Sequence, residues 1–118
     1  MSKSAPPPDQ PKPDLVHIVL PPYEVPELIV MGGVVVENRG HGSAQNVKIV
    51  LEYDDTIPAK IRHLQVISDA EYILLSGGEQ RPFATIRLRQ LGPGHRVVIY
   101  YSGPDRVQPR VKVTHYEG

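Results

Sequence analysis

The stretch VVVENRGHGSAQNVKIVLEY, residues 34–53, decides the fold class of this 118-residue chain. Two apolar runs flank a polar break that contains two glycines. In the second run Val47, Ile49 and Leu51 fall on one face, and this period of two is typical of a half-buried antiparallel strand. The first run is rich in β-branched residues, which also favours a strand. The stretch therefore predicts two strands joined by a bend.

The break itself, ENRGHGSAQN (37–46), raises the question of a phosphate-binding loop. Such a loop needs a helix that begins at its end, so that backbone N–H groups face the anion. Here an alternating strand follows, and no Lys follows Gly42 at the spacing of a P-loop. We therefore interpret the break as a turn in which Gly40 and Gly42 supply positive φ angles and the Asn38 side chain caps the bend.

Similar strand signals recur along the chain, separated by turn residues. The runs 83–91 and 95–102 flank Gly92-Pro93-Gly94, where Pro93 fixes φ and Gly94 permits a positive φ, so we expect a hairpin there. The run LVHIVL (15–20) ends before Pro21 and Pro22, which predicts an edge strand or a strand that stops at Leu20. Eight runs carry this signal, one of them less regular than the others, so we expect about seven strands. The runs are LVHIVL (15–20), 28–38, 45–53, 61–67, the less regular YILLS (72–76), 83–91, 95–102 and 110–116.

No stretch shows helical periodicity over three turns, and the strand pattern predicts an all-β fold. We expect an antiparallel, Greek-key β-sandwich of immunoglobulin-like type, with a small β-barrel as the alternative. Residues 1–14, which contain five prolines, are predicted to be a disordered linker, and residues 15–118 the sandwich domain. The predicted core contains Val34, Val36, Val47, Ile49, Leu51, Ile86, Leu88, Leu91 and Ile99.

The composition excludes several function classes. The chain has no Cys, so it cannot form disulfides or thiolate metal sites. Its 13 basic and 13 acidic residues balance, which argues against a nucleic-acid partner. No apolar run approaches the ~20 residues of a membrane helix, so we expect no direct membrane insertion by this chain. The N-terminus has no apolar core of a signal peptide, and the chain resembles a fragment of a larger protein.

Residues capable of catalysis or metal binding are scattered. Five histidines lack the local spacing of a metal site, so we predict no bound metal and no cofactor. Asp54, Asp55 and Asp69 offer at most a weak Ca²⁺ site. The chain has no G-x-S-x-G elbow and no nucleophile paired with a base at diagnostic spacing, so we predict that it is not an enzyme.

Basic side chains near the C-terminus form the one binding face that the sequence suggests. If 83–91 and 95–102 form a hairpin, their arginines share one face, which the last strand then extends. Such a face, with Tyr100, Tyr101 and Tyr116 nearby, can bind nucleic acid or an acidic polymer. The alternative is a solvated outer face that keeps the sheet soluble. The predicted basic set is Arg87, Arg89, Arg96, Arg110 and Lys112.

The opening stretch resembles the adhesion-related immunoglobulin-like modules of bacterial and archaeal surface proteins. Their pattern is a hydrophobic strand, Asn-x-Gly, a short polar loop, a small residue, and a strand that begins with Asn or Thr and Val. The resemblance spans roughly residues 14–116, and the segment 56–82 is longer and more hydrophobic than in those modules. The matching residues are Val34, Val36, Asn38, Gly40, Ala44, Asn46, Val47 and Ile49, with Leu91, Pro93 and Gly94 in a Leu-x-Pro-Gly turn.

The resemblance implies an interaction or spacer module without catalytic residues. We therefore expect a non-enzymatic module of a larger prokaryotic membrane-associated or cell-envelope protein. Its partner would be a protein or a second copy of the chain. The alternative is a domain that binds carbohydrate or an acidic polymer through an Arg/Tyr sheet face, although the chain has no Trp and a single Phe. The longer segment 56–82 is expected to add edge strands or a binding surface.

Overall fold

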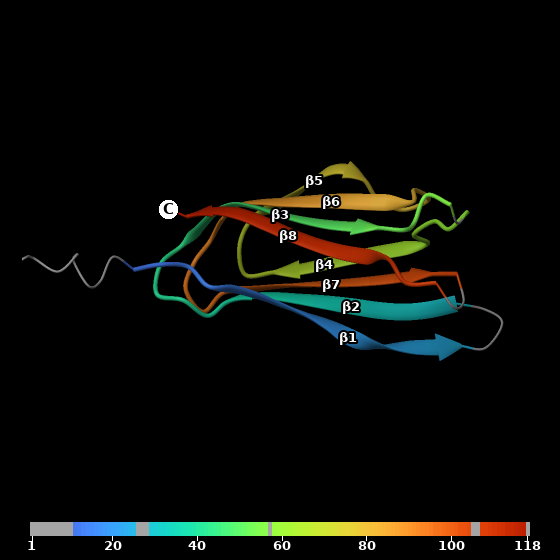
Figure 1. The fold of residues 1–118 in the computed structure, drawn as a ribbon, viewed down its shortest axis with the longest axis horizontal. Coiled ribbons are helices and arrows are strands. Elements are labelled where there is room, and N and C mark those ends of the chain that lie inside the picture. Colours follow the sequence, from blue (N-terminus) through green and yellow to red (C-terminus); the bar gives the residue numbers. More distant parts are fainter. Residues whose placement is uncertain (1–10, 26–28, 57, 105–106, 118) are drawn as a thin grey trace, which may run out of the picture.

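Two antiparallel four-stranded sheets face each other in the computed structural model, which describes residues 11–25, 29–56, 58–104 and 107–117 (Figure 1). Sheet A has the order β1-β2-β7-β4, and sheet B has the order β5-β6-β3-β8. The described residues contain no helix. The strands are β1 (Leu15–Val25), β2 (Ile29–Asn38), β3 (Ala44–Glu52), β4 (His63–Ser68), β5 (Tyr72–Gly77), β6 (Phe83–Leu91), β7 (Arg96–Gly103) and β8 (Arg110–Glu117).

The predicted β-sandwich is confirmed, with eight strands in the described residues rather than about seven. The segment 56–82 supplies β4 and β5, and each of them lies at the edge of a sheet, as expected. The strand β1 is also an edge strand, and it continues past Pro21 and Pro22 with a register shift between Leu20 and Tyr23. Prolines are tolerated there because the outer edge of the strand donates to no ladder.

The expected hairpin between β6 and β7 is wrong, because these strands belong to different sheets. The Pro93–Gly94 turn is present, and Gly94 has the expected positive φ of 77°. The turn carries the chain across the core instead of back along the same sheet. Both strands are alternating, so their sequences fit an arch between two sheets as well as they fit a hairpin.

The core lies between the sheets and is built from the alternate residues of their central strands. All nine predicted core residues are fully buried. Burying each large aliphatic side chain contributes about 1.5–3 kcal/mol, so the central strands β2, β3, β6 and β7 supply most of the hydrophobic stabilisation. Further buried residues are Ala44, Tyr53, Ala59, Ile61, Ala84, Val97 and Tyr101.

Asn38, the last residue of β2, is fully buried and connects several elements. Its Oδ1 accepts hydrogen bonds from the backbone N–H of Asp14 (3.1 Å) and of Gly40 (3.0 Å). Its Nδ2 donates to the carbonyl oxygens of Gly42 (2.8 Å) and Leu91 (2.9 Å). The expected cap is confirmed, and it also joins the start of β1 and the end of β6 to the bend.

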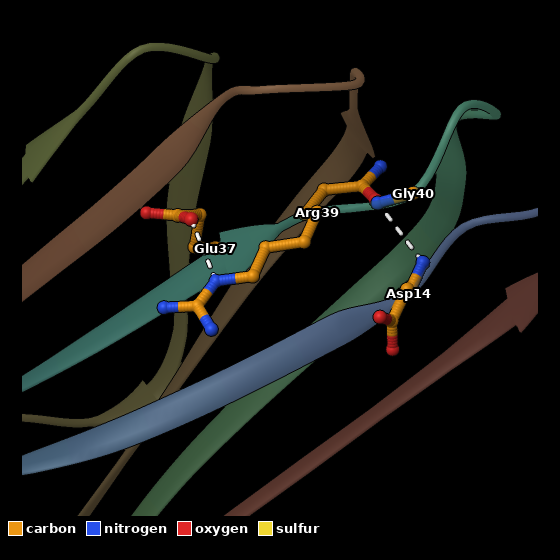
Figure 2. Close-up of polar contacts among 5 residues, drawn as sticks. Asp14, Glu37, Arg39 and Gly40 are labelled. Atoms are coloured by element: carbon orange, nitrogen blue, oxygen red, sulfur yellow. Dashed lines mark hydrogen bonds and ion pairs between the residues drawn. The ribbon is translucent and has the colours of Figure 1, made fainter.

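The expected positive φ angles at Gly40 and Gly42 are wrong, because the glycines that adopt positive φ in the described residues are others. These two glycines are needed for a close approach instead. A side chain at Gly40 would overlap the backbone of residues 12–14, and one at Gly42 would overlap the backbone of Pro11. Figure 2 shows Asp14 beside Gly40, with Arg39 reaching back to Glu37 through a 2.9 Å ion pair.

Residues 11–14, which the sequence predicted to be part of a disordered linker, therefore lie directly against the bend that follows β2, and the rest of that predicted linker, residues 1–10, lies outside the described residues. Arg39 N–H donates to the Asp14 carbonyl (2.9 Å), and the N–H groups of His41 and Gly42 donate to the Lys12 carbonyl at 3.0 and 3.1 Å. At the same end of the sandwich β8 finishes, since Glu117 is opposite Ala44 in the register. The first described strand thus starts, and the last one ends, at one end of the molecule (Figure 1).

Candidate functional site

The outer face of sheet A carries a row of aliphatic side chains that crosses all four strands. Val34 and Val36 point into the core, so Val35 between them points outward. In the register Ile18 is opposite Val35, Val35 is opposite Val98, and Val98 is opposite Ile67. Ile18 is 44% exposed and Ile67 is 52% exposed. We call Ile18, Val35, Val98 and Ile67 the aliphatic row.

Beside this row lies a groove with a glycine floor. Gly33 is flanked in the sheet by Leu20 of β1 and Tyr100 of β7. A side chain at Gly33 would meet Leu20 Cδ1 at 2.8 Å and Tyr100 Cδ1 at 3.3 Å, so these two side chains lean over the bare backbone. Tyr23 and Met31 continue the apolar wall and are 69% and 49% exposed. This glycine groove has a volume of about 650 Å³.

One end of the glycine groove is polar. His63 Nδ1 and Ser102 Oγ form a hydrogen bond of 2.9 Å, and Gln65 lies alongside on β4. The Glu79 carboxylate accepts a hydrogen bond of 3.2 Å from the backbone N–H of Leu64. Ser102 is only 4% exposed, so its hydroxyl is engaged mainly in the hydrogen bond with His63. The groove thus offers apolar walls and, at one end, side chains able to hydrogen-bond a bound chain.

The predicted basic set does not share one face. Arg87 and Arg89 lie on β6, and Arg110 and Lys112 lie on β8, all in sheet B. Arg96 starts β7 and lies in sheet A, so its place on the same face is wrong. The cause is the β6–β7 turn, which crosses between sheets instead of closing a hairpin.

Sheet B nevertheless gathers positive charge on its outer face. Lys48 of β3 lies opposite Arg87, and Val50 lies opposite Lys112. Arg110 forms an exposed 3.4 Å ion pair with Glu52. We call Lys48, Arg87, Arg110 and Lys112 the sheet B basic face.

Part of the arginine charge in sheet B lies near carboxylates. Arg87 and Arg89 line a hollow of about 740 Å³ together with Asp69 and Glu71 of the β4–β5 turn. The predicted basic set left out Lys48, although its place between the inward Val47 and Ile49 marks it as outward.

The three tyrosines expected near the basic set are divided among three environments. Tyr100 lies at the glycine groove on sheet A. Tyr101 is buried in the core, and its hydroxyl donates a 2.8 Å hydrogen bond to Gln108 Oε1. Tyr116 is on β8 of sheet B and is 68% exposed. Adjacent residues of a strand point to opposite faces, which separates Tyr100 from Tyr101.

The three aspartates considered for Ca²⁺ do not come together. Asp54 follows β3 at the end of the sandwich where Glu52 is opposite Arg110. Asp69 lies beyond the other end of the sheets, where its backbone N–H donates a hydrogen bond to the Arg96 carbonyl. The backbone and side chain of Thr56 donate hydrogen bonds to Asp54, which lowers the pKa of that carboxyl. Among the described residues no three His, Asp or Glu side chains are grouped so as to hold a metal ion.

The fold and its surfaces define a class: a two-sheet antiparallel β-sandwich with an apolar groove on one outer face and a basic patch on the other. No protein-family model matches the chain, and no curated protein matches its sequence. The described residues include no helix long and apolar enough to span a membrane.

The glycine groove was not predicted from the sequence, although the Gly32-Gly33 pair inside an apolar strand was its signal.

Proposed function

We propose that the chain is a non-enzymatic interaction module, an immunoglobulin-like sandwich within a larger prokaryotic membrane-associated or surface protein. Its partner is a polypeptide with an apolar anchor, which lies on the outer face of sheet A. The observation that carries this proposal is the aliphatic row beside the glycine groove. Single exposed aliphatic residues are ordinary, whereas a contiguous apolar patch marks an interaction surface.

The strand arrangement supports the immunoglobulin-like assignment. The order β1-β2-β7-β4 parallels the A-B-E-D sheet of that fold, and the adjacency of β3 and β8 parallels that of its C and F strands, whereas β5 and β6, which fall between β4 and β7 in the chain, have no counterpart in that scheme. The strands β4 and β5 come from the segment 56–82, which is the part of the chain that departs from the resemblance.

The position of the chain ends favours interaction over a spacer role. A spacer gains length only when the chain enters at one end of a domain and leaves at the other. Here β1 begins and β8 finishes at the same end, beside the bend at residues 39–44. Copies in series would therefore project sideways, and each would present its outer faces to solvent.

The proposal is tested by comparing the two outer faces in the protein's own cellular setting. A photo-reactive amino acid replaces Val98 of sheet A or, as the matched control, Val50 of sheet B; both are half-buried valines on outward faces. We expect one discrete cross-linked species from position 98 and none from position 50. Equal yields at both positions, or no adduct at position 98, would refute the proposal.

A second function is favoured by a separate observation, the sheet B basic face. It would bind an acidic polymer, and its affinity would fall with rising salt because bound counterions are released. Arg87→Ala combined with Lys112→Ala is expected to elute from heparin at clearly lower salt than the unmodified chain. Arg96→Ala, which removes a charge from sheet A, should leave the elution nearly unchanged. If the chain is not retained even at low salt, this function is excluded.

A further inference from the structure

The strand β5 is an unusually apolar sheet edge. It ends sheet B, and no strand in the described ranges lies on its far side. Tyr72, Ile73, Leu74 and Leu75 follow one another and are 43%, 53%, 49% and 45% exposed, respectively. Tyr72 and Leu74 are opposite the inward residues of β6, whereas Ile73 is opposite the outward Arg87, so both faces of β5 remain open.

The other three sheet edges each carry a feature that hinders pairing with a further strand. The strand β1 contains two prolines and a register shift, and β8 carries Arg110 and Lys112. On β4, the Leu64 N–H is already bonded to the Glu79 carboxylate. Prolines, charges and covered edges are the usual means by which proteins prevent edge-to-edge association. From residue 72 to 77, β5 has neither proline nor charge, so this edge remains open to a partner strand.

We propose that β5 pairs in antiparallel orientation with β5 of a second copy of the chain. The pairing is centred on Ile73, which keeps the outward side chains of both copies on one continuous face. Tyr72 of each copy then lies opposite Leu74 of the other, an aromatic–aliphatic cross-strand pair. Glu71 lies opposite Leu75 and Asp69 opposite Gly77, so no like charges meet. The sequence of this edge is thus complementary to itself.

The small size of the exposed β5 surface argues for a weak association. Four large side chains that are each half exposed supply roughly 400 Å² per copy, against the ~800 Å² per partner of a stable complex. The register shift between Leu74 and Ser76 limits the regular part of the edge to its first half. We therefore expect a weak dimer that is populated only at high protein concentration. This inference uses a different surface from the interaction function proposed above and is independent of it.

Sedimentation equilibrium of the full chain at concentrations up to about 1 mM tests the proposal, because a dimer of this strength is populated there. Ile73→Lys should weaken the association at least tenfold. Ile67→Lys is the matched control, since Ile67 is 52% exposed but lies on β4 of sheet A. This control should still dimerise. A monomeric unmodified chain, or dimerisation lost only in Ile67→Lys, would overturn the proposal.

A second measurement reports the register directly, and it uses the absence of cysteine from the chain. Opposed residues of an antiparallel pair have Cβ atoms about 4.5–5.5 Å apart, within reach of a disulfide after small adjustments. Under mild oxidation Ile73→Cys should form a covalent dimer, and Ile67→Cys should form far less. Equal cross-linking of both variants would show random collision and would contradict the β5 register.

Discussion

Asn38→Ala is expected to lower the free energy of unfolding by about 3 kcal/mol, measured by urea denaturation. The change removes four hydrogen bonds, two accepted by Oδ1 and two donated by Nδ2. The Leu91 carbonyl loses a buried partner, and an unsatisfied buried polar group costs about 1–3 kcal/mol. The backbone N–H of Asp14 also loses its partner, so residues 11–14 should be held less firmly.

Asn46 provides the control, because it is an asparagine in the same region with a different role. It has a positive φ of 51°, and its Oδ1 is buried without a hydrogen-bond partner among the described residues. Asn46→Gly should therefore change the free energy of unfolding by less than about 1 kcal/mol. Glycine adopts a positive φ without strain, so this effect of the change is stabilising. A loss below 1 kcal/mol for Asn38→Ala as well would show that the bend does not depend on the Asn38 side chain.

Gly103→Ala should also be strongly destabilising, by about 3 kcal/mol, because the new methyl group would overlap the Tyr53 hydroxyl. Tyr53 is 1% exposed and cannot swing away into solvent. Its hydroxyl has no hydrogen-bond partner among the described residues, so Tyr53→Phe alone should be nearly neutral or stabilising. Gly103→Ala combined with Tyr53→Phe should recover at least half of the free energy of unfolding that Gly103→Ala loses. If the two changes are simply additive in urea denaturation, the contact does not limit position 103.

Tyr53 also contributes to the pH dependence of stability at alkaline pH. Burial, and secondarily the neighbouring Tyr101, raises the pKa of Tyr53 to about 12. In the unfolded chain this phenol ionises near pH 10. The folded state retains the proton longer, so this contribution to stability is complete below about pH 10 and is lost as the pH rises toward 12. Tyr53→Phe should show a shallower alkaline decline in the free energy of unfolding, whereas an unchanged decline would place the effect elsewhere.

The core could be predicted from the sequence because alternation is a local property of a strand. Val47, Ile49 and Leu51 identify one face of β3 without any knowledge of its neighbours, and all three are buried. Asn38 could be predicted as a cap because its side chain bonds to the backbone only two and four residues away. Its bonds to Asp14 and Leu91 depend on distant chain segments and could not be predicted.

The pairing of strands and the surfaces required the three-dimensional structure. A turn of Pro93 and Gly94 fits a hairpin and an arch equally well, and this ambiguity placed Arg96 on the wrong sheet. The glycine groove exists because Leu20 and Tyr100, which are 80 residues apart, lie on either side of Gly33. Likewise, Gly40 looked like a turn residue, whereas its function is to admit the backbone of residues 12–14.

The shared position of the chain ends determines how the domain would respond to mechanical force. Tension applied through the segments before Pro11 and after Glu117 would enter at one end, where Leu15 is opposite Asn38 and Glu117 is opposite Ala44. The hydrogen bonds of each outer strand would then be loaded one after another, as when a zipper opens, instead of all together in shear. The side-chain hydrogen bonds of Asn38 would be among the first to carry that load, so the domain should begin to unfold at low force from this end.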